Sequence, residues 1–401
     1  MKVVWIINQY ASTSETGIGG RHYYLGKQLA KKGCKVYIIT ASYSHILHKP
    51  KQLNDWILVE KIDKNFNYVW IKTLKYKNAH SKKRVLNWII FTFKVLKLLK
   101  KLETPNIIIS SSPQPFVFLS AYKIAKKVKS KLFFEVRDIW PLSLIELGNI
   151  SSKHPFIRLM GWVEKRAYQK SNYIISNLIN FYEYLQQFNI PENKFIWISN
   201  GVCLEEMDVS EPLDKNIIKR IPKDKFIVGY AGSIGLANAL EYLLEAAELL
   251  KENKNIFFII IGEGSEKSKL MKKYSGLDNI LFLPAIPKKQ IQCLLYYFDV
   301  CYIGWLKKRM YNYGVAANKI FDYMYSEKPI LHSYSGKQDI ILKADCGLTV
   351  EAENSKAIAE GILKFYEMPK EKYYDLGKNG KQYILRYLTY KKLAEKLENY
   401  F

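Results

Sequence analysis

Residues 226–261 have the sequence FIVGYAGSIGLANALEYLLEAAELLKENKNIFFIII. An apolar run at 226–230 leads into a glycine-rich stretch, then into apolar residues at helical spacing over 240–251, and then into a second apolar run at 256–261. This succession predicts a βαβ unit, in which a helix connects two parallel strands. Both apolar runs are continuous rather than alternating, which is typical of strands covered by helices on both faces. The stretch therefore predicts an α/β domain with a doubly wound parallel sheet.

The same alternation of apolar runs and helical segments extends in both directions along the chain. In the first half, strands are expected at residues 3–8, 35–40, 68–72, 106–110, 132–136, 173–176 and 195–198. In the second half, further strands are expected at residues 280–283, 300–303, 329–333 and 347–350, and a helix at 318–325.

A linker is predicted between residues 200 and 225, where prolines and mixed charges replace the periodic pattern. We therefore expect two doubly wound domains of similar size, residues 1–205 and residues 206–382. The last segment, 383–401, is expected to be helical, and the pattern leaves open whether it packs back on the first domain.

Charge is distributed unevenly between these two halves. The formal net charge of the chain is +25, and residues 1–200 have 32 basic and 11 acidic side chains, against 30 and 26 in residues 201–401. An anionic partner is therefore expected to meet the first half.

Several classes of protein are excluded by simpler features. The 5 cysteines are scattered without a CxxC pair, which fits neither a zinc site nor a disulfide framework and favours a reducing cytosol. The N-terminal residues enter a strand-like run directly, so we expect no signal peptide. The longest apolar stretch, 85–93, is far shorter than the roughly 20 residues of a transmembrane helix.

Glycine-rich turns follow strands in both halves. They are Gly17-Ile18-Gly19-Gly20, residues 229–235 and Gly262-Glu263-Gly264. Glycine lets the backbone approach a ligand closely, and the helix that follows offers its N-terminus to an anion. The spacing is not GxGxxG, so a dinucleotide fingerprint is not supported. The alternative is that these segments are tight turns only.

Charged residues at element ends are the other site candidates. Arg137 and Asp138 end a strand before Pro141, and Ser112 ends the preceding strand. Lys319 and Asp322 are three residues apart on the expected helix. A lysine suits a diphosphate and a carboxylate suits ribose hydroxyls, whereas the alternative in each case is an ordinary structural or solvated ion pair.

Metal-binding and nucleophile motifs are missing from the sequence. It contains no HExxH, GxSxG, GxxxxGK[ST] or Asp-x-Asp motif, so we expect no obligate metal.

Taken in order, these segments resemble the retaining glycosyltransferases of family 4. The resemblance runs nearly end to end and is carried by LGKQLAKKGCKVYIIT (25–40), EVRDIWP (135–141), ISNGV (198–202), GYAGSIGLANALEYLLEAAELL (229–250), IIIGEGSEKSKL (259–270), LFLPAIP (281–287) and NKIFDYMYSEKPIL (318–331). It implies the GT-B fold, two Rossmann-like domains facing a central cleft. The branch most similar in character builds O-antigen and capsule sugars and includes N-acetylfucosaminyl transferases.

The resemblance also implies roles for particular residues. Its donor-binding positions are Gly19, Gly20, Ser233, Gly262, Gly264, Ala285, Ile286, Asn318 and Asp322, with the backbone of Ala285 and Ile286 facing the base and Asp322 facing the ribose. Its catalytic positions are Arg137, Asp138 and Lys319, with Lys319 neutralising the leaving diphosphate, aided by Lys307 or Arg309. Ser112 would face the acceptor.

Three positions depart from the family pattern. Arg137 replaces a common His, Ala317 replaces a common Pro, and Gly314 stands where the first carboxylate of the E-x7-E motif is expected. The first departure argues against a simple proton shuttle at Arg137, and the last removes an expected contact to the donor hexose.

The implied reaction transfers a sugar from a nucleoside diphosphate, with UDP as the expected nucleotide, to an acceptor hydroxyl with retention at the anomeric carbon. A saccharide on a polyprenyl diphosphate lipid is the expected acceptor. No enzyme nucleophile is evident, so positioning and charge stabilisation would supply the catalysis. Two other readings stay open, a sugar-nucleotide 2-epimerase of the same fold and a non-catalytic scaffold that binds membranes or polyanions.

The basic excess is densest between residues 72 and 131, which hold 15 basic residues and a single acidic one. Within it, Trp88 and Phe91 recur at helical spacing, with Lys94 and Lys97 nearby. Aromatic residues interleaved with lysines are typical of an interfacial helix on an anionic membrane. The alternative is an apolar stripe that packs on the sheet while its lysines are solvated. No nucleic-acid motif accompanies the charge, so we expect a cytoplasmic protein peripherally bound to the inner face of the cell membrane.

Overall fold

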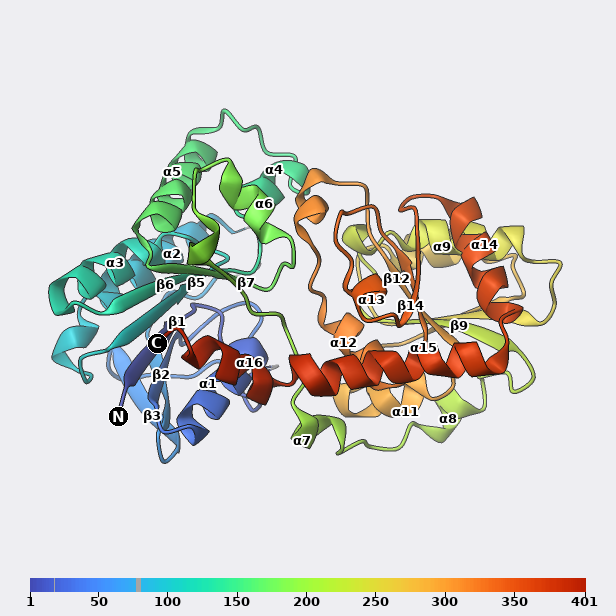
Figure 1. Cartoon of the computed structure of the whole chain (residues 1–401), viewed down its shortest axis with the longest axis horizontal. Coiled ribbons are helices and arrows are strands. Elements are labelled where there is room, and N and C mark those ends of the chain that lie inside the picture. The colour runs from blue at the N-terminus through green and yellow to red at the C-terminus, as the bar shows by residue number, and fades with distance from the viewer. Residues whose placement is uncertain (18, 77–80) are drawn as a thin grey trace. The chain divides into compact units, whose positions relative to one another are not determined.

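The computed structural model describes residues 1–17, 19–76 and 81–401, so Ile18 of the first glycine turn lies outside the described residues. The chain forms two compact units (Figure 1). Unit 1 comprises Met1–Ser199 and Tyr390–Phe401, and unit 2 comprises Asn200–Thr389. The first boundary therefore lies six residues before the expected 205/206, and of the C-terminal segment 383–401 the part Tyr390–Phe401 belongs to unit 1.

Unit 1 is built on an eight-stranded sheet of order β3-β4-β2-β1-β5-β6-β7-β8. Its strands are β1 (Val3–Ile7), β2 (Lys35–Ala41), β3 (Ile57–Asp63), β4 (Phe66–Ile71), β5 (Ile107–Ser111), β6 (Lys131–Val136), β7 (Tyr173–Ser176) and β8 (Phe195–Trp197). Seven of them were expected, and they pair in parallel. The edge strand β3 was not expected, and it pairs antiparallel with β4. It is largely exposed, so it lacks the continuous apolar run that marks the buried strands.

Two layers of helices cover this sheet. They are α1 (Arg21–Lys31), α2 (Lys82–Val95), α3 (Val117–Val128), α4 (Leu142–Glu146), α5 (Pro155–Lys170), α6 (Phe181–Gln186) and α16 (Tyr390–Glu398). Helix α1 packs against α16, and α3 packs against both α2 and α5. The C-terminal helix therefore completes the layer that α1 begins.

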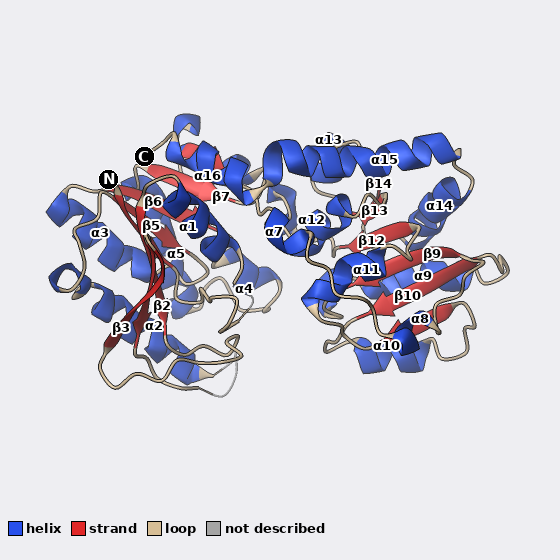
Figure 2. Ribbon diagram, turned by 90° about the horizontal axis from the view of Figure 1, so that it is seen from below, coloured by secondary structure: helices blue, strands red, loops and turns tan. Residues whose placement is uncertain are grey.

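Unit 2 has a six-stranded parallel sheet of order β11-β10-β9-β12-β13-β14 (Figure 2). Its strands are β9 (Phe226–Ala231), β10 (Ile256–Ile261), β11 (Ile280–Leu283), β12 (Val300–Gly304), β13 (Ile330–Ser333) and β14 (Gly347–Val350). Its helices are α7 (Leu204–Met207), α8 (Lys215–Ile218), α9 (Leu240–Leu249), α10 (Lys267–Lys273), α11 (Ile291–Leu295), α12 (Asn318–Tyr325), α13 (Ile340–Lys343), α14 (Ser355–Tyr366) and α15 (Lys370–Tyr383).

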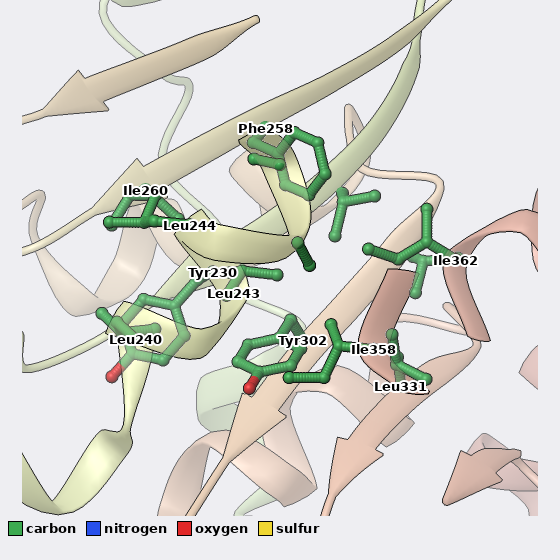
Figure 3. Packing of buried hydrophobic residues seen from close by; sticks show 14 of the residues in the cluster. Tyr230, Leu240, Leu243, Leu244, Phe258, Ile260, Tyr302, Leu331, Ile358 and Ile362 are labelled. Atoms are coloured by element: carbon green, nitrogen blue, oxygen red, sulfur yellow. The ribbon is translucent and has the colours of Figure 1, made fainter. Parts of the chain in front are cut away.

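The core of unit 2 lies between the sheet and the pair α9 and α14, which pack on each other. Figure 3 shows Leu243 and Leu244 of α9 and Ile362 of α14 against Phe258 and Tyr302 of the strands. All five are buried, because the strands and one face of each helix carry apolar residues.

Strand order reverses next to the first strand of each unit, between β1 and β5 in unit 1 and between β9 and β12 in unit 2. In open α/β sheets, ligands bind outside the carboxyl ends of the strands at such a reversal. A ligand site is therefore expected in each unit at the carboxyl ends of the two strands that flank the reversal.

Candidate functional site

In unit 2, a lysine of α12 lies at the carboxyl end of β9 and contacts uncharged partners. Lys319, in the first turn of α12, places its ammonium 2.5 Å from the Tyr230 hydroxyl and 2.7 Å from the Asn238 Oδ1. It also lies 4.2 Å from the centroid of the Tyr230 ring. Burial of the ammonium lowers the pKa of Lys319 to about 7. The site thus holds an amine whose protonated form an incoming anion would stabilise.

The glycine-rich turn after β9 makes room for this lysine. A Cβ at Gly232 would lie 3.1 Å from Nζ and from Cε of Lys319. The next turn residue, Ser233, is exposed, and its carbonyl accepts hydrogen bonds from the Tyr230 hydroxyl and from Asn238. The turn and the lysine therefore form one hydrogen-bonded arrangement.

Gly262 and Gly264 are explained by backbone packing. A Cβ at Gly262 would lie 1.8 Å from the carbonyl oxygen of Gly232, and a Cβ at Gly264 would lie 2.1 Å from that of Ile234. The turns after β9 and β10 touch directly, so both glycines are required whether or not a ligand binds.

Asp322 lies one turn after Lys319 and is 7% exposed. Both of its carboxylate oxygens accept from Lys288, which begins a short 3-10 helix after β11. Its backbone carbonyl accepts from Gln292 at 3.2 Å. The expected ribose contact is therefore an ion pair in this structure, and its cation is itself 57% exposed.

The other expected unit 2 residues surround this edge. Ala285 is exposed and Ile286 half-buried in the turn between β11 and Lys288, and Asn318 is the exposed first residue of α12. The Asn200 amide donates to the Asn318 Oδ1 at 3.2 Å and to the Ala316 carbonyl at 2.8 Å. Asn200 thus ties the start of unit 2 to the start of α12.

Lys307, a candidate aid to Lys319, forms a different contact. Its ammonium lies 2.6 Å from the Glu351 Oε1. Arg309 begins a 3-10 helix that ends at Tyr313, in the segment before α12. In this structure the positive charge of Lys307 is already compensated by a carboxylate.

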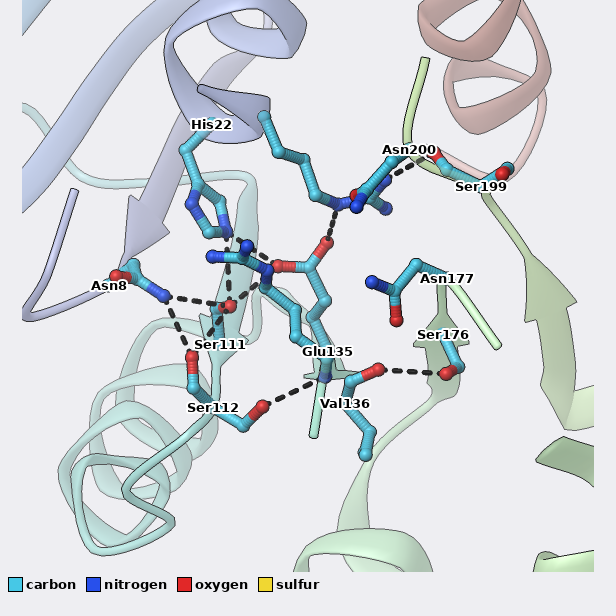
Figure 4. Close-up of polar contacts among 12 residues, drawn as sticks. Asn8, His22, Ser111, Ser112, Glu135, Val136, Ser176, Asn177, Ser199 and Asn200 are labelled. Carbon is cyan, nitrogen blue, oxygen red and sulfur yellow. Dashed lines mark hydrogen bonds and ion pairs between the residues drawn. The ribbon is translucent and has the colours of Figure 1, made fainter. Parts of the chain in front are cut away.

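In unit 1, the corresponding edge carries a buried ionic cluster centred on Glu135 (Figure 4). The Glu135 Oε1 accepts from the Arg21 Nε at 2.8 Å, and its Oε2 lies 2.6 Å from the His22 Nε2 and from the Ser111 Oγ. The side chains of Arg21, His22 and Glu135 are at most 5% exposed. Arg21 also donates from Nη1 to the Ser199 carbonyl.

Charge within this cluster is matched. Burial opposes ionisation of Glu135, but Arg21 and His22 hold its pKa well below the usual range. Burial lowers the pKa of His22 despite the neighbouring carboxylate, so the neutral ring donates its Nε2 proton to Glu135. The Arg21 cation is therefore compensated within the protein.

The cluster joins the two expected unit 1 loops. Arg21 and His22 open α1 directly after Gly19 and Gly20, whose φ angles are 70° and 79°. A Cβ at Gly20 would meet nothing within 4 Å, so this left-handed residue borders open space. The double glycine thus satisfies a backbone conformation that other residues rarely adopt.

Arg137 and Asp138 follow β6 two and three residues after Glu135. The Arg137 N–H donates to the Ser112 Oγ at 2.9 Å, and the Asn8 amide donates to the Ser112 carbonyl at 2.8 Å. Among the described residues, the buried Arg137 Nε has no hydrogen-bond partner. Asp138 is exposed. The structure therefore gathers Arg137, Ser112 and the glycine turn at one edge of the unit 1 sheet.

The membrane role expected for Trp88 and Phe91 is wrong. Trp88 is 4% and Phe91 0% exposed, and the Trp88 ring lies beside Trp140 and Phe156. The apolar stripe packs inward, as the alternative reading held, because a helix on a sheet buries its most apolar face. Lys94 is half-buried and donates to the Lys72 carbonyl, whereas Lys97 is exposed.

A second, outward apolar strip lies on the opposite side of α2. Leu86, Ile89 and Phe93 are 48%, 44% and 64% exposed. On α5, Leu159 and Trp162 are 49% and 53% exposed. Among the described residues, no helix combines the length and the apolar character needed to cross a bilayer.

Several of these residues escaped the sequence reasoning. They are Arg21, His22, Glu135, Tyr230, Asn238 and Lys288. Glu135 could have been noticed, because a carboxylate inside the apolar run KLFFEV must find a buried partner. Arg21, which directly follows a double glycine, could have been suggested as that partner. Tyr230 and Asn238 gave no signal, since their role depends on the turn that folds over Lys319.

Two family models match the chain. One, described as Glycosyltransferase Family 4, covers residues 16–206, and the other, described as Glycosyl transferases group 1, covers residues 214–383. The matches fall on unit 1 and unit 2 respectively and leave only short segments uncovered.

Two curated relatives are similar over part of the sequence. The probable glycosyltransferase WbjE of Pseudomonas aeruginosa is 22% identical over 246 residues, which is 60% of this chain and 60% of that protein. The putative colanic acid biosynthesis glycosyl transferase WcaI of Escherichia coli K12 is 38% identical over 66 residues, or 16% of each. The matches thus span less than two thirds of these relatives.

Solved structures resemble the whole chain. Sucrose-phosphate synthase from Thermosynechococcus elongatus superimposes with a TM-score of 0.76 at 16% identity, covering 100% of this chain and 98% of that one. HepE of Anabaena, solved in complex with UDP, gives a TM-score of 0.66 at 12% identity, covering 100% and 99%. At these identities, the likeness establishes the GT-B fold.

Proposed function

The chain belongs to the family 4 glycosyltransferases of the GT-B fold, and on that premise we propose that it transfers a sugar from a UDP-sugar to a lipid-linked saccharide in bacterial surface polysaccharide synthesis. WbjE and WcaI, and the colanic acid named for the latter, support the class of product. The complex of HepE with UDP supports the nucleotide. O-antigen or capsule is the proposed destination of the product.

The observation that carries the proposal is the environment of Lys319. Its partners are a tyrosine hydroxyl and an amide oxygen, so among the described residues its charge has no counter-charge at the carboxyl ends of the strands, where ligands of such sheets bind. A diphosphate supplies the missing anion. In the proposed complex Asp322 exchanges Lys288 for the ribose hydroxyls, and the backbone of Ala285 and Ile286 faces the base.

The proposed reaction proceeds with retention on one face of the sugar. The bond from the anomeric carbon to the diphosphate oxygen breaks, and the acceptor oxygen bonds to that carbon on the same face. The acceptor proton passes to the departing phosphate oxygen, whose charge Lys319 stabilises. We propose no metal for this step, because a lysine performs the neutralisation.

Unit 1 would bind the acceptor. The Arg137 Nε is buried without a partner among the described residues, and the Glu135 cluster fixes the loop that carries it. An arginine in this position suits an acceptor or donor phosphate. Arg137 and Asp138 are accordingly proposed to contact the reacting sugar, and Ser112 the acceptor.

An anionic membrane is the proposed partner of the outward side of α2, α3 and α5. These helices carry four, three and four basic residues, and their single acidic residue, Glu164, is buried. Each basic residue near an anionic surface contributes about 1 kcal/mol, and the exposed Phe93 and Trp162 can insert at the headgroup level. We propose this surface for membrane contact in place of the buried Trp88 and Phe91. It suits a peripheral protein at the inner face of the cell membrane.

Vesicle sedimentation tests the membrane surface. The chain should sediment with phosphatidylglycerol-containing vesicles and not with pure phosphatidylcholine, and Phe93→Glu or Trp162→Glu should each weaken binding about tenfold or more. Leu249→Glu, at an exposed apolar residue of unit 2, is the matched control and should change nothing. Equal losses in all three variants, or preferential binding to RNA, would contradict the proposal.

Calorimetry with UDP, GDP and a panel of UDP-sugars tests the donor. UDP and at least one UDP-sugar should bind, and EDTA should not alter binding. Anomeric analysis of the product by NMR should show retention. Release of a free epimerised sugar without an acceptor would instead favour the 2-epimerase, and binding of no nucleotide would favour the scaffold.

A further inference from the structure

Trp305 is the first residue after β12, at the point where the strand order of unit 2 reverses. Strand β12 pairs with β9, whose end carries Tyr230 and the lysine site, and with β13 on its other side. The Trp305 N–H donates to the Ser333 carbonyl at 3.1 Å, and its side chain is half-buried. Trp305 thus lies at the carboxyl end of the strand next to β9, whose own carboxyl end adjoins the proposed diphosphate site.

A fully buried histidine orients this indole. The His332 Nε2 lies 2.9 Å from the Trp305 Nε1, and the His332 Nδ1 lies 2.8 Å from the Asp339 Oδ2. Indole can only donate and carboxylate can only accept, so the ring carries its proton on Nδ1 and accepts at Nε2. Asp339 is fixed in turn by the Thr349 hydroxyl and by the Ile341 N–H at 2.8 Å. Donation therefore runs from Trp305 through His332 to Asp339, and Thr349 of β14 donates to the same carboxylate.

A second contact fixes the segment that follows Trp305. The Tyr334 hydroxyl donates to the Tyr311 carbonyl at 2.6 Å, and the rings of Trp305 and Tyr311 lie 5.1 Å apart. A Cβ at Gly336 would lie 1.9 Å from the Tyr334 hydroxyl oxygen, so the contact needs a glycine there. The segment between β12 and α12 is held at both of these points.

This segment has no acidic group to offer a ligand, and among its aromatic residues Trp305 is half-buried whereas Tyr311 and Tyr313 are buried. Residues 304–317 contain no Asp or Glu, and Gly314 occupies the position where the family's first carboxylate is expected. Ligand sites combine apolar and aromatic walls with a few oriented polar groups. We propose that the indole of Trp305 contacts the donor sugar and determines sugar specificity, and that His332 is the positioning residue that holds it. The inference rests on the proposed UDP-sugar donor.

The test compares affinity for the sugar with affinity for the nucleotide. Calorimetry would measure UDP and the tightest-binding UDP-sugar of the panel against Trp305→Ala, His332→Leu and His332→Gln. Leu249→Ala is the control, at an exposed position outside the site. A glutamine retains one donor and one acceptor, whereas a leucine removes both.

Trp305→Ala should weaken UDP-sugar binding about tenfold, the worth of one aromatic contact, and UDP binding less than about twofold. His332→Leu should shift the same ratio in the same direction, and His332→Gln should restore it in part. A merely structural cluster would weaken both ligands equally or neither, and either result overturns the inference. A wild-type protein that binds no UDP would refute the donor proposal itself and this inference with it.

Discussion

Each unit places a cation at the carboxyl edge of its sheet, but only one of the two cations is compensated. In unit 1, Arg21 pairs with Glu135 at 2.8 Å inside a buried hydrogen-bonded network. In unit 2, Lys319 contacts a hydroxyl and an amide oxygen. Charge taken from water needs a counter-charge, so the first arrangement is complete within the protein and the second calls for a ligand.

A cation at the carboxyl ends of the strands therefore has a structural role in unit 1 and a proposed ligand-binding role in unit 2. The Glu135 cluster holds together the glycine turn, the end of β5 and the loop of Arg137, which is a structural task. Lys319 maintains an electrostatic cost in the empty protein that a diphosphate would remove. Substitutions should therefore affect stability with opposite sign in the two units.

Removing the cation of unit 1 should cause the largest effect. Arg21→Met leaves the buried Glu135 without its main counter-charge, and breaking such a pair typically costs about 3–5 kcal/mol. Urea unfolding should show this loss, and Glu135→Gln should lose at least as much, because it leaves the buried Arg21 guanidinium, which does not deprotonate, without a counter-charge. If Arg21→Met proved as stable as the wild type, the cluster would not be the closed ion pair described here.

Removing the cation of unit 2 should abolish activity and spare the fold. Lys319→Met deletes a charge that only the ligand compensates, so turnover should fall by about 10²–10³ or more. The melting temperature of the unliganded protein should be unchanged or higher. Turnover near the wild-type value, or a fall in stability like that of Arg21→Met, would contradict the claim that Lys319 serves the ligand whereas Arg21 stabilises the fold.

A smaller effect is expected at Glu164 of α5, a buried acid without a cation. Its Oε1 accepts from the hydroxyls of Tyr168 and Tyr184, and burial raises its pKa to about 8. The folded state therefore binds a proton that the unfolded state releases at its ordinary pKa of 4.5, and the stability from this group is lost as pH rises through 8.

Glu164→Gln keeps the acceptor oxygen for both tyrosines and removes the proton linkage. The urea midpoint of this variant minus that of the wild type should increase from pH 5 to pH 9. A parallel pH dependence of the two proteins would show that Glu164 stays ionised in the folded state.

Much of the fold was predictable because its strands are continuous apolar runs, and the family resemblance implied a GT-B fold with two Rossmann-like domains. Edge strand β3 was missed because exposure on both faces removes that signal. On α2, the aromatic residues were assigned to the wrong face, since periodicity shows that a stripe exists but not whether a sheet or a membrane covers it. Phe93, the most exposed apolar residue of that helix, belongs to the other face.

In the candidate site, the sequence predicted single residues whose position along the chain suggests a function, but not the contacts between them. Lys319 and Arg137 could be named from their positions after strands and at a helix start. The partners that define their electrostatics come from distant segments: Tyr230 and Asn238 for Lys319, and Arg21 for Glu135, two residues before Arg137. A single sequence does not bring such segments together.

Proton uptake on donor binding tests the central claim most directly. The pKa of Lys319 is about 7 in the empty protein, and a bound diphosphate raises it, whereas a UDP-sugar has no group of its own that titrates nearby. Titrations at pH 8 in buffers of different ionisation enthalpy should show uptake of close to one proton per UDP-sugar bound, and at pH 6 close to none. Equal heats in all buffers at pH 8 would contradict the assignment of Lys319 as the diphosphate's counter-charge.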